Sequence, residues 1–425
     1  MLQRTRALLA LARGNEIAAL AAAPHDAFVL DRLGMHMAAT QAPVPAVDFL
    51  GLHGQAVSLA KLGNIAEAKH RAAAARMRWT RKQRRRFALA IAPWSPDEAA
   101  YMLKPIHPLA AAAAALAAGD IQLARKIMPR ETPRGEELQF PAVGAALASH
   151  EGDWSNARAL LDRVLSLGNL SSLASGGQGP LLLASFPTPV VGCGDDGPAV
   201  TVLMPVRNVE DYIAMAIASL RAQTLANWEL LIVDDASTDQ TAERAEAAAA
   251  SDPRIRVLRN PRQLGAFGSR NVALKSARGR YVTVLDGDDF AHRQRLESHV
   301  RILDAGMYRA VASLLLRIDT EGRIVAPRVF PMARRNYSSL MIGTELARQL
   351  GGFDDVPMGG DSAMFWRVQA KLGRKALLRL NQVDTFALQR ETSLTAAAGT
   401  GIGNREALAA RVAYHERIMR ELAGV

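Results

Sequence analysis

Three aspartates stand close together directly after a strand-like segment of this chain. The stretch RYVTVLDGDDF, residues 280–290, runs from strand-forming residues into Asp286, Asp288 and Asp289. Burying carboxylates costs several kcal/mol each unless a positive group meets them. A nearby lysine or arginine, solvent, or a metal ion that carries a substrate could each be that partner.

The spacing of the first two aspartates suits a divalent cation. Asp286 and Asp288 alternate along an extended chain, and Gly287 between them permits the close approach of another group. A hard cation bound by carboxylate oxygens acts as a Lewis acid and neutralises charge that develops on a diphosphate leaving group.

The elements that position these aspartates begin near residue 199, where strand-length apolar runs alternate with segments of helical period. The predicted strands cover residues 200–205, 228–235, 254–260 and 280–289, and the predicted helices cover residues 211–223, 241–250 and 266–277. Continuously apolar strands that alternate with helices are typical of a parallel sheet covered on both faces. Ligands of such sheets bind beyond the carboxyl ends of the strands.

Polar residues follow the predicted strands at that edge. Pro205 and Arg207 end the first strand, Asp234 and Asp235 end the second, and the acidic cluster ends the fourth. Carboxylates therefore converge from at least two neighbouring strands. Taken singly, such a residue could simply cap the next helix, as Asp239 could. The set as a whole favours a binding site.

Four ordered motifs resemble the inverting GT-A glycosyltransferases of family 2. The family opening has a strand ending in P-x-Y-N, a helix ending in Q-T and a strand ending in V-D-D-G-S-x-D, and residues 200–241 resemble it. Residues 260–289 resemble the family forms N-x-G-x-x-x-A-R-N and D-x-D-D, and residues 351–373 and 388–395 resemble the later motifs. The resemblance covers about residues 199–400, with departures at Arg207 and Ala236.

The resemblance implies a site for a nucleotide-sugar donor. Asp235 matches the position that reads the base, and a carboxylate can accept the imide N–H of uracil, which favours a UDP-sugar. Pro205 and Arg207 would line the same pocket, and Asp234 would bind ribose or buttress the loop. Arg270 would meet the diphosphate or pair with a carboxylate.

The resemblance also implies a cofactor, Mn²⁺ or Mg²⁺. Asp288 would be its direct ligand, with Asp286 nearer the ribose or a metal-bound water, and Asp289 a structural residue at the start of the next helix. In the late motif, Arg390 and Ser393 would contact the diphosphate, because arginine binds such oxygens with paired hydrogen bonds. No histidine follows Arg390 at the family position, so a histidine ligand is not supported.

An inverting transfer needs one general base to deprotonate the acceptor hydroxyl. Asp361 matches the base of the family's G-x-E-D-like motif, although Gly360 replaces the common glutamate. A capping role for Asp361 at a helix over residues 362–371 is an alternative that is compatible with catalysis. Asp354 and Asp355 are the other candidates for the base.

The N-terminal residues 1–170 predict a separate helical domain. Alanine-rich amphipathic segments are separated by Gly-Asn or Gly-Asp pairs at residues 14–15, 63–64, 119–120 and 152–153. Glycine ends one helix and the Asx side chain caps the next, which predicts helical hairpins similar to tetratricopeptide repeats but irregular. We therefore expect a linker at residues 171–198, a GT-A domain at 199–400 and a C-terminal helix at 401–425.

The composition limits the setting of the protein. The chain has 425 residues, a net charge of +11 and one cysteine, Cys193, so an intramolecular disulfide is excluded and a reducing compartment is favoured. The N-terminus shows no signal peptide, and the longest apolar run, residues 108–119, is too short to span a bilayer. These features predict a soluble, cytoplasmic protein.

The basic segment Lys69–Arg86 holds nine Lys or Arg residues and no acidic residue. A solvated helical face is the simplest interpretation. A peripheral contact with an acidic membrane, with Trp79 as an interfacial anchor, is the second, and RNA binding is the third.

The leading hypothesis from the sequence is a metal-dependent inverting glycosyltransferase. It would move a sugar from a nucleotide donor to a glycan or lipid-linked acceptor in surface polysaccharide assembly. A nucleotidyltransferase is the alternative among enzymes, but PVRNVED lacks the glycine-rich phosphate loop that such an enzyme needs. A helical-repeat scaffold with a degenerate transferase domain is the alternative outside enzymes, and the altered motif at Gly360 is its best support.

Overall fold

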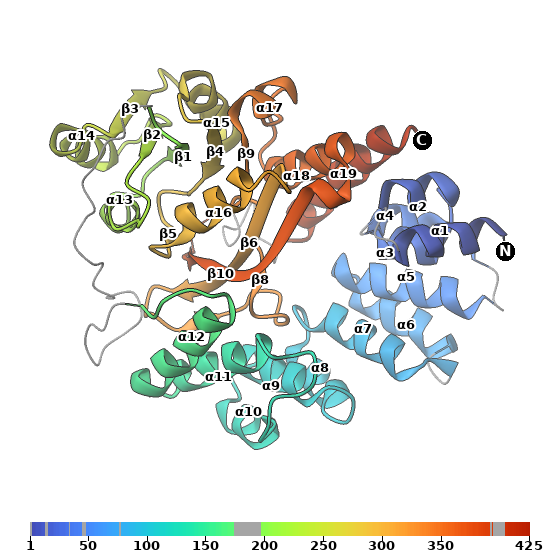
Figure 1. The fold of residues 1–425 in the computed structure, drawn as a ribbon. Coiled ribbons are helices and arrows are strands. Elements are labelled where there is room, and N and C mark those ends of the chain that lie inside the picture. Colours follow the sequence, from blue (N-terminus) through green and yellow to red (C-terminus); the bar gives the residue numbers. More distant parts are fainter. Residues whose placement is uncertain are drawn as a thin grey trace. The chain divides into compact units, whose positions relative to one another are not determined.

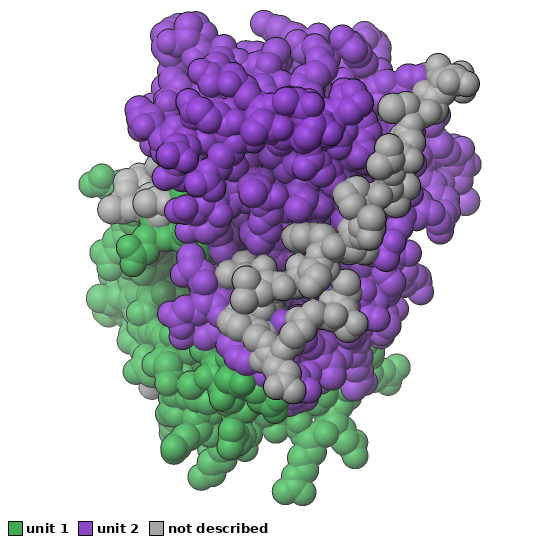
Figure 2. Space-filling view, turned by 90° about the vertical axis from the view of Figure 1, so that its left-hand side faces the viewer, with its two compact units in different colours: residues 1–153, 324–332, 389–425 green, residues 154–323, 333–388 purple. Residues whose placement is uncertain are grey.

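The computed structural model describes residues 2–12, 16–33, 35–44, 48–75, 78–173, 197–391, 393 and 404–425. The chain divides into two compact units (Figure 2). Unit 1 comprises residues 1–153, 324–332 and 389–425, and unit 2 comprises residues 154–323 and 333–388. The domain limits expected at residues 170, 198 and 400 stay predictions, and most of the expected linker, with Cys193, lies outside the described residues.

Unit 1 is built from short helices (Figure 1). Consecutive helices such as α5 and α6, or α8 and α9, pack against each other. The helices are α1 (Leu2–Ala12), α2 (Glu16–Ala22), α3 (Ala27–Arg32), α4 (His36–Gln41), α5 (Phe49–Lys61), α6 (Ile65–Ala75), α7 (Arg81–Ile91), α8 (Pro96–Leu103), α9 (Pro108–Ala117), α10 (Ile121–Ile127), α11 (Gln139–His150) and α19 (Arg405–Ala423), and the short strand β7 (Ile324–Val325) also belongs to this unit.

The glycines that were expected to end helices adopt the left-handed conformation that favours glycine. The φ angles are +80° at Gly63, +79° at Gly119 and +76° at Gly152. Asp120 then caps α10, because its carboxylate accepts the Leu123 N–H at 2.8 Å. The pair at residues 14–15 lies outside the described residues, and the likeness to tetratricopeptide repeats stays a prediction.

The longest apolar run of the sequence is a core helix of unit 1. In α9, the residues from Leu109 to Leu116 are all buried, which is the behaviour of a helix that is apolar on every side. Among the residues that the structure describes, no helix is long and apolar enough to cross a membrane.

The basic segment Lys69–Arg86 spans α6 and α7, and many of its charges are engaged within unit 1. Arg71 pairs with Glu67 at 2.9 Å, and Arg85 pairs with Glu136 at 3.3 Å. The proposed interfacial role of Trp79 is wrong, because this side chain is buried. Its ring packs edge-on against His53 and beside Phe87.

Unit 2 contains a twisted sheet with the strand order β3-β2-β1-β4-β9-β6-β10-β5, and β8 pairs with β6 (Figure 1). The first four of these strands are parallel to one another, and β9 runs antiparallel to both β4 and β6. The strands are β1 (Val200–Val206), β2 (Trp228–Asp234), β3 (Ile255–Arg259), β4 (Tyr281–Val284), β5 (Phe290–Ala291), β6 (Ala310–Asp319), β8 (Arg334–Arg335), β9 (Met341–Gly343) and β10 (Leu377–Gln389).

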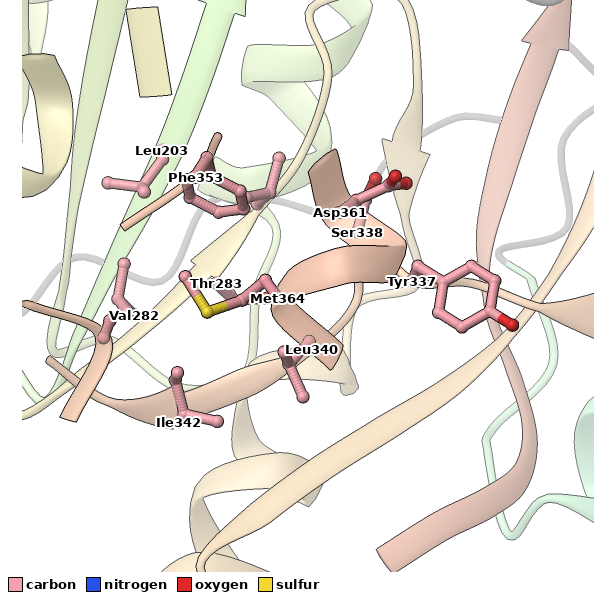
Figure 3. Close-up of a pocket in the computed structure, with 12 residues that line it drawn as sticks. Leu203, Val282, Thr283, Tyr337, Ser338, Leu340, Ile342, Phe353, Asp361 and Met364 are labelled. Carbon is pink, nitrogen blue, oxygen red and sulfur yellow. The ribbon is translucent and has the colours of Figure 1, made fainter. Parts of the chain in front are cut away.

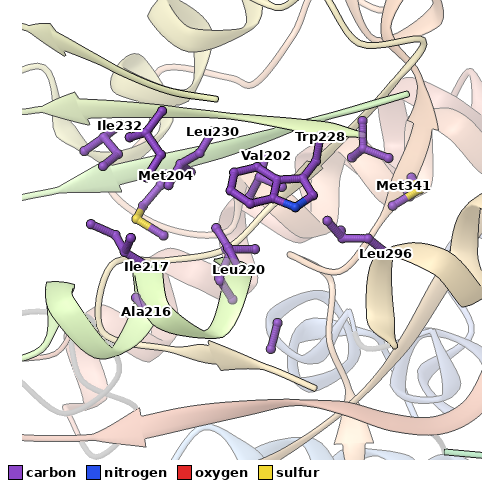
Figure 4. Packing of buried hydrophobic residues seen from close by; sticks show 14 of the residues in the cluster. Val202, Met204, Ala216, Ile217, Leu220, Trp228, Leu230, Ile232, Leu296 and Met341 are labelled. Carbon is purple, nitrogen blue, oxygen red and sulfur yellow. The ribbon is translucent and has the colours of Figure 1, made fainter. Parts of the chain in front are cut away.

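Two apolar layers cover the sheet. One layer includes Val202, Met204, Trp228 and Ile232 with the helices α13 and α16 (Figure 4). The other layer alternates with it along the strands and packs against α15, α17 and α18. The helices of this unit are α12 (Trp154–Leu167), α13 (Ile213–Arg221), α14 (Thr241–Ser251), α15 (Gly265–Ser276), α16 (Arg295–Asp304), α17 (Thr344–Gln349) and α18 (Gly360–Leu372), with a 3₁₀ turn at Arg374–Ala376.

The expected fold class is confirmed: a helical N-terminal region precedes a mainly parallel sheet of the GT-A type. The antiparallel strands β8, β9 and β10 were not predicted. β8 and β9 span two and three residues, which is too short for a periodic signal in the sequence.

Candidate active site at the strand ends

The carboxyl ends of β1, β2 and β4 meet at one edge of the sheet, as expected. Val206 is in register with Asp234, and Leu203 is in register with Val284. The Asp235 N–H donates to the Val206 carbonyl at 2.9 Å, which joins the first two strand ends beyond the ladder. The residues that follow these three strands therefore lie at the same edge of the sheet, beyond the carboxyl ends of the strands.

The Asp235 carboxylate accepts three hydrogen bonds from the protein. It accepts hydrogen bonds from Asn260 Nδ2 at 2.8 Å and from the backbone N–H groups of Leu264 and Gly265 at 2.7 and 2.8 Å. Asp235 thus orders the loop that leads into α15. By contrast, Asp234 is buried but its Oδ1 atom has no hydrogen-bond partner.

The loops after β1 and β2 support each other. Pro205 is half-buried within β1, and Arg207 is exposed directly after it. Asn208, which has a positive φ of 50°, accepts the Thr238 N–H at 2.9 Å. Asp239 accepts the Thr241 N–H, at the first residue of α14, at 3.0 Å, although the cap residue of this helix is Gln240.

Arg270 is one positive partner of the acidic cluster. Its Nη2 atom lies 2.6 Å from Asp286 Oδ1, while its guanidinium lies beside the rings of Phe267 and Phe353. Arg270 is only 4% exposed, and its Nε and Nη1 atoms are buried without a hydrogen-bond partner. Of the two expectations for Arg270, the structure shows the pairing with a carboxylate.

The other two aspartates of the cluster differ in their surroundings. Asp288 is partly exposed, whereas Asp289 accepts the Leu388 N–H at 3.1 Å. Burial raises the pKa of Asp289 well above its ordinary value, and the charges of Asp288 and Asp286 raise it further. The expectation that Asp289 starts the next helix is wrong. The two-residue strand β5 follows it, and α16 begins only at Arg295.

The expected close approach at Gly287 is seen. A Cβ atom added to Gly287 would lie 2.5 Å from Val206 Cγ1, so the acidic turn packs against the end of β1 with no room for a side chain.

The donor set suits a hard cation that brings some of its own ligands. Within the described residues, no group of three or more His, Cys, Asp or Glu side chains is arranged to hold a metal ion. Asp286 has a side chain that is 34% exposed, and Asp288 is also accessible. Two accessible carboxylates fit Mg²⁺ or Mn²⁺, because Mg²⁺ is commonly held by one or two carboxylates together with substrate phosphates and water.

Asp361 lies in the first turn of α18 rather than at its cap. The helix begins at Gly360, and Gly359, with a φ of +91°, is the cap residue. The Asp361 carboxylate is half-buried and accepts the N–H of the adjacent Ser362 at 2.9 Å. Asp361 also lines a small, mainly apolar pocket together with Tyr337 (Figure 3).

The structure explains the glycine that replaces the family's glutamate. A Cβ atom added to Gly360 would lie 2.8 Å from Cδ1 of the Phe267 ring. The ring therefore occupies the space that a longer side chain would need. Of the other candidates for the base, Asp354 is paired with Arg367 at 2.6 Å, and Asp355 is exposed.

Arg390 and Ser393 are grouped with unit 1. The Ser393 N–H donates to the Arg390 carbonyl at 3.1 Å, which closes a turn. The rest of the late motif, from residue 394, lies outside the described residues. The contact of these two side chains with a donor stays a prediction.

Sequence reasoning missed a buried polar network behind the acidic turn. Arg295, His299 and Asp384 are all fully buried. His299 Nε2 lies 2.9 Å from Asp384 Oδ2, and Arg295 Nε lies 4.0 Å from Asp384 Oδ1. Burial works to raise the pKa of Asp384, but His299 and Arg295 hold it below its ordinary value. A lone aspartate within the strand LLRLNQVDTFALQ was the available signal.

A mainly parallel sheet with carboxylates in the loops after its strands is an α/β arrangement in which ligands bind beyond the carboxyl ends of the strands. Residues 201–368, most of which belong to unit 2, match the family described as Glycosyl transferase family 2.

Curated relatives agree with this assignment. The UDP-Glc:alpha-D-GlcNAc-diphosphoundecaprenol beta-1,3-glucosyltransferase WfgD of Escherichia coli is 43% identical over 104 residues, which cover 24% of this chain and 40% of the relative. The putative glycosyltransferase EpsE of Bacillus subtilis is 34% identical over 173 residues, covering 38% of this chain and 62% of the relative. The chain thus spans about half the length of the curated relatives that it matches.

Among solved structures, S. aureus TarS 1-349 in complex with UDP-GlcNAc is similar, with 23% sequence identity and a TM-score of 0.39. The similarity covers 46% of this chain and 59% of TarS 1-349.

Proposed function

We propose that this protein is an inverting glycosyltransferase that moves a sugar from a nucleotide-diphosphate donor to a glycan or lipid-linked acceptor. The observation that carries the proposal is the accessible pair Asp286 and Asp288 at the edge where three parallel strands end. The names of relatives, including a putative colanic acid biosynthesis glycosyl transferase of Escherichia coli, support a role in bacterial surface polysaccharide synthesis.

The donor in this proposal is a UDP-sugar. Pro205 and Arg207 would line the base pocket with Asp235, and Asp234 would use its free Oδ1 atom to accept a ribose hydroxyl. Arg270 supports the placement of the diphosphate, because two of its buried N–H groups lack a partner in the unliganded protein. Arg390 and Ser393 would contact the same diphosphate from the late motif.

The cofactor in this proposal is Mn²⁺ or Mg²⁺, held by Asp288 with Asp286 as its neighbour. When bound, such an ion supplies neutralisation of the negative charge on the diphosphate leaving group. The residues of the chain would orient that diphosphate, with Arg270 opposite the carboxylates.

The general base in this proposal is Asp361, which would take the proton from the acceptor hydroxyl. Its carboxylate is partly exposed and its one hydrogen bond shown is to a neighbouring backbone N–H. Asp354 is less suited, because Arg367 already neutralises it.

The test of transfer is the release of UDP from a panel of UDP-sugars with Mn²⁺, with and without a glycan acceptor or a bacterial lipid extract. We expect UDP release that depends on Mn²⁺ and rises with an acceptor. No release from UDP-, GDP- or ADP-sugars under any of these conditions would contradict the proposal and would favour the scaffold alternative.

We also propose a peripheral contact of unit 1 with an acidic membrane surface. Lys82 and Arg84 on α7 are exposed, and they supply positive charge that the ion pairs of the neighbouring residues do not use. Because Trp79 is buried, this contact would be electrostatic and would lack an aromatic anchor.

A further inference from the structure

The acidic turn, residues 285–289, is held at its start by a buried arginine. Arg295, the first residue of α16, donates from Nη2 to the Val284 carbonyl at 2.8 Å and to Thr283 Oγ1 at 3.2 Å. Val284 is the last residue of β4, two positions before Asp286. The direction in which the chain leaves β4 is therefore fixed by the Arg295 guanidinium.

The same turn is held at its end by β10. The Leu388 N–H donates to Asp289 Oδ1 at 3.1 Å, and the His292 N–H donates to the Asp384 carbonyl at 2.8 Å. Between these two contacts, β5 pairs with β10 in antiparallel register. The segment that follows the turn is thus part of the sheet.

Asp384 links the two anchors of the turn. Its Oδ1 atom faces Arg295 Nε at 4.0 Å and accepts the Ser313 hydroxyl at 2.6 Å, and its Oδ2 atom accepts from His299 and Gln382. Arg295 and Asp384 are 1% and 0% exposed. A buried ion pair is weak evidence for stability, since well-packed apolar side chains would often serve as well. The buried pair of Arg295 and Asp384 is therefore better explained by the way it positions the acidic turn than by a gain in stability.

We propose that Arg295 and Asp384 are positioning residues, which fix both ends of the acidic turn so that Asp286 and Asp288 face a divalent cation and a diphosphate. This inference rests on the proposed function for its consequence, although the fixing of the turn itself is independent of any ligand. Groups behind the ligands of a metal site orient those ligands and tune their affinity.

The test uses Arg295→Lys in the full-length protein. Lysine keeps the positive charge opposite Asp384, but its single ammonium cannot reproduce the planar fork that reaches the Val284 carbonyl and also faces Asp384. The matched control is Arg254→Lys. Arg254 is also buried and paired with an aspartate, Asp252, but it precedes β3 at the opposite end of the parallel strands.

The first measurement is hydrogen–deuterium exchange, by mass spectrometry, of peptides covering residues 285–289 in the ligand-free protein. We expect exchange about tenfold faster in Arg295→Lys and unchanged in Arg254→Lys. The second is calorimetry, in which the Kd for UDP in Mn²⁺ weakens about tenfold in Arg295→Lys while the Kd for UDP without metal stays within about twofold.

The outcomes separate this inference from the proposed function. If the wild-type protein shows no effect of Mn²⁺ on UDP binding, the proposed function fails, and the exchange comparison still decides whether Arg295 fixes the turn. Exchange that is unchanged in the turn, or raised equally across unit 2, overturns the positioning role. If Arg295→Lys does not fold, Asp384→Asn takes its place, with the same expected changes.

Discussion

At the scale of single residues, the three aspartates of the acidic turn have separate surroundings. Asp286 is paired with Arg270, Asp289 is tied to β10, and Asp288 is accessible. A second arginine, Arg295, lies buried behind the turn. Arginine side chains therefore supply positive charge to this cluster.

Replacing Asp361 with asparagine tests the general base. We expect Asp361→Asn to keep the Kd for UDP within about twofold and to lower sugar transfer by about 10²–10⁴-fold, because an amide cannot accept the acceptor proton. Asp355→Asn, an exposed neighbour, is the matched control and should retain activity. An Asp361→Asn variant with wild-type transfer would remove Asp361 from this role.

A second prediction at this scale concerns His53 in unit 1. His53 is buried, and its Nε2–H donates to the Gln83 carbonyl at 3.0 Å. Burial lowers the pKa of His53 from 6.5 to about 4. As the pH falls, His53 therefore takes up a proton in the unfolded chain before it does so in the folded chain. The contribution of neutral His53 to the unfolding free energy is fully present above pH 6.5 and is lost as the pH falls from 6.5 to 4.

Urea unfolding at pH 7.5 and pH 5.0 measures this effect. We expect His53→Gln to reduce the loss of unfolding free energy between these two pH values by about 2 kcal/mol. His70→Gln, an exposed histidine, is the control and should leave the pH dependence unchanged. An equal pH dependence in wild type and His53→Gln would show that His53 does not titrate in this way.

At the scale of elements, α15 packs closely against the start of α18 because the residue there, Gly360, has no side chain. The Phe267 ring of α15 occupies the space beside Gly360 at the start of α18. This contact sets where α18 begins and therefore where Asp361 lies. The Phe267 ring thus occupies the space that the glutamate of the family motif would need.

Adding one methyl group at this contact tests the fit. We expect Gly360→Ala to lower the unfolding free energy by about 1–3 kcal/mol, because the new Cβ atom would overlap the Phe267 ring. Gly343→Ala is the control, since its Cβ atom would meet its nearest neighbour only at 4.0 Å. Phe267→Leu in the Gly360→Ala background should recover part of the loss. If thermal denaturation shows the same loss of stability for Gly360→Ala and Gly343→Ala, the tight fit at Gly360 is refuted.

The sequence predicted those elements whose pattern is local and periodic. The predicted strand at 228–235 and helix at 241–250 agree with β2 and α14 within one residue at either end, because apolar runs and helical spacing are readable from neighbours. The strands β8 and β9 exist only through pairing with distant segments, and so they gave no signal.

The candidate site was likewise predictable where it depends on neighbouring residues and not where it depends on distant ones. The acidic turn was evident from residue types alone, whereas the Arg270–Asp286 pair was left as one of two alternatives. The link from Asp384 to Arg295 joins residues that are 89 positions apart, from 295 to 384, and no local pattern marks it. Tertiary packing, rather than residue type, creates that part of the site.

At the scale of the whole molecule, the chain combines a segment that matches glycosyltransferase family 2, residues 201–368, with a basic, helical unit 1. The net charge of +11 is compatible with attraction to acidic surfaces. The ion pairs of Arg71 and Arg85 show that part of the basic segment stabilises unit 1 itself. Only the exposed remainder is available to a membrane.

Flotation with liposomes tests the membrane proposal. We expect binding to vesicles that contain acidic lipids at low salt and release at high salt, because electrostatic contacts are screened. The double variant Lys82→Glu/Arg84→Glu should lose binding, whereas Lys126→Glu/Arg130→Glu, with the same charge change at exposed positions of unit 1, should retain it. Binding that neither salt nor the first variant weakens would contradict an electrostatic contact through α7.

The central claim is that Asp288 binds a divalent cation that in turn binds a nucleotide diphosphate. Isothermal titration of UDP with and without Mn²⁺, on the wild type and on Asp288→Ala, tests it most directly. We predict that Mn²⁺ strengthens UDP binding to the wild type by at least about tenfold and has no effect on Asp288→Ala. An equal effect of Mn²⁺ on both proteins, or no effect on the wild type, would contradict it.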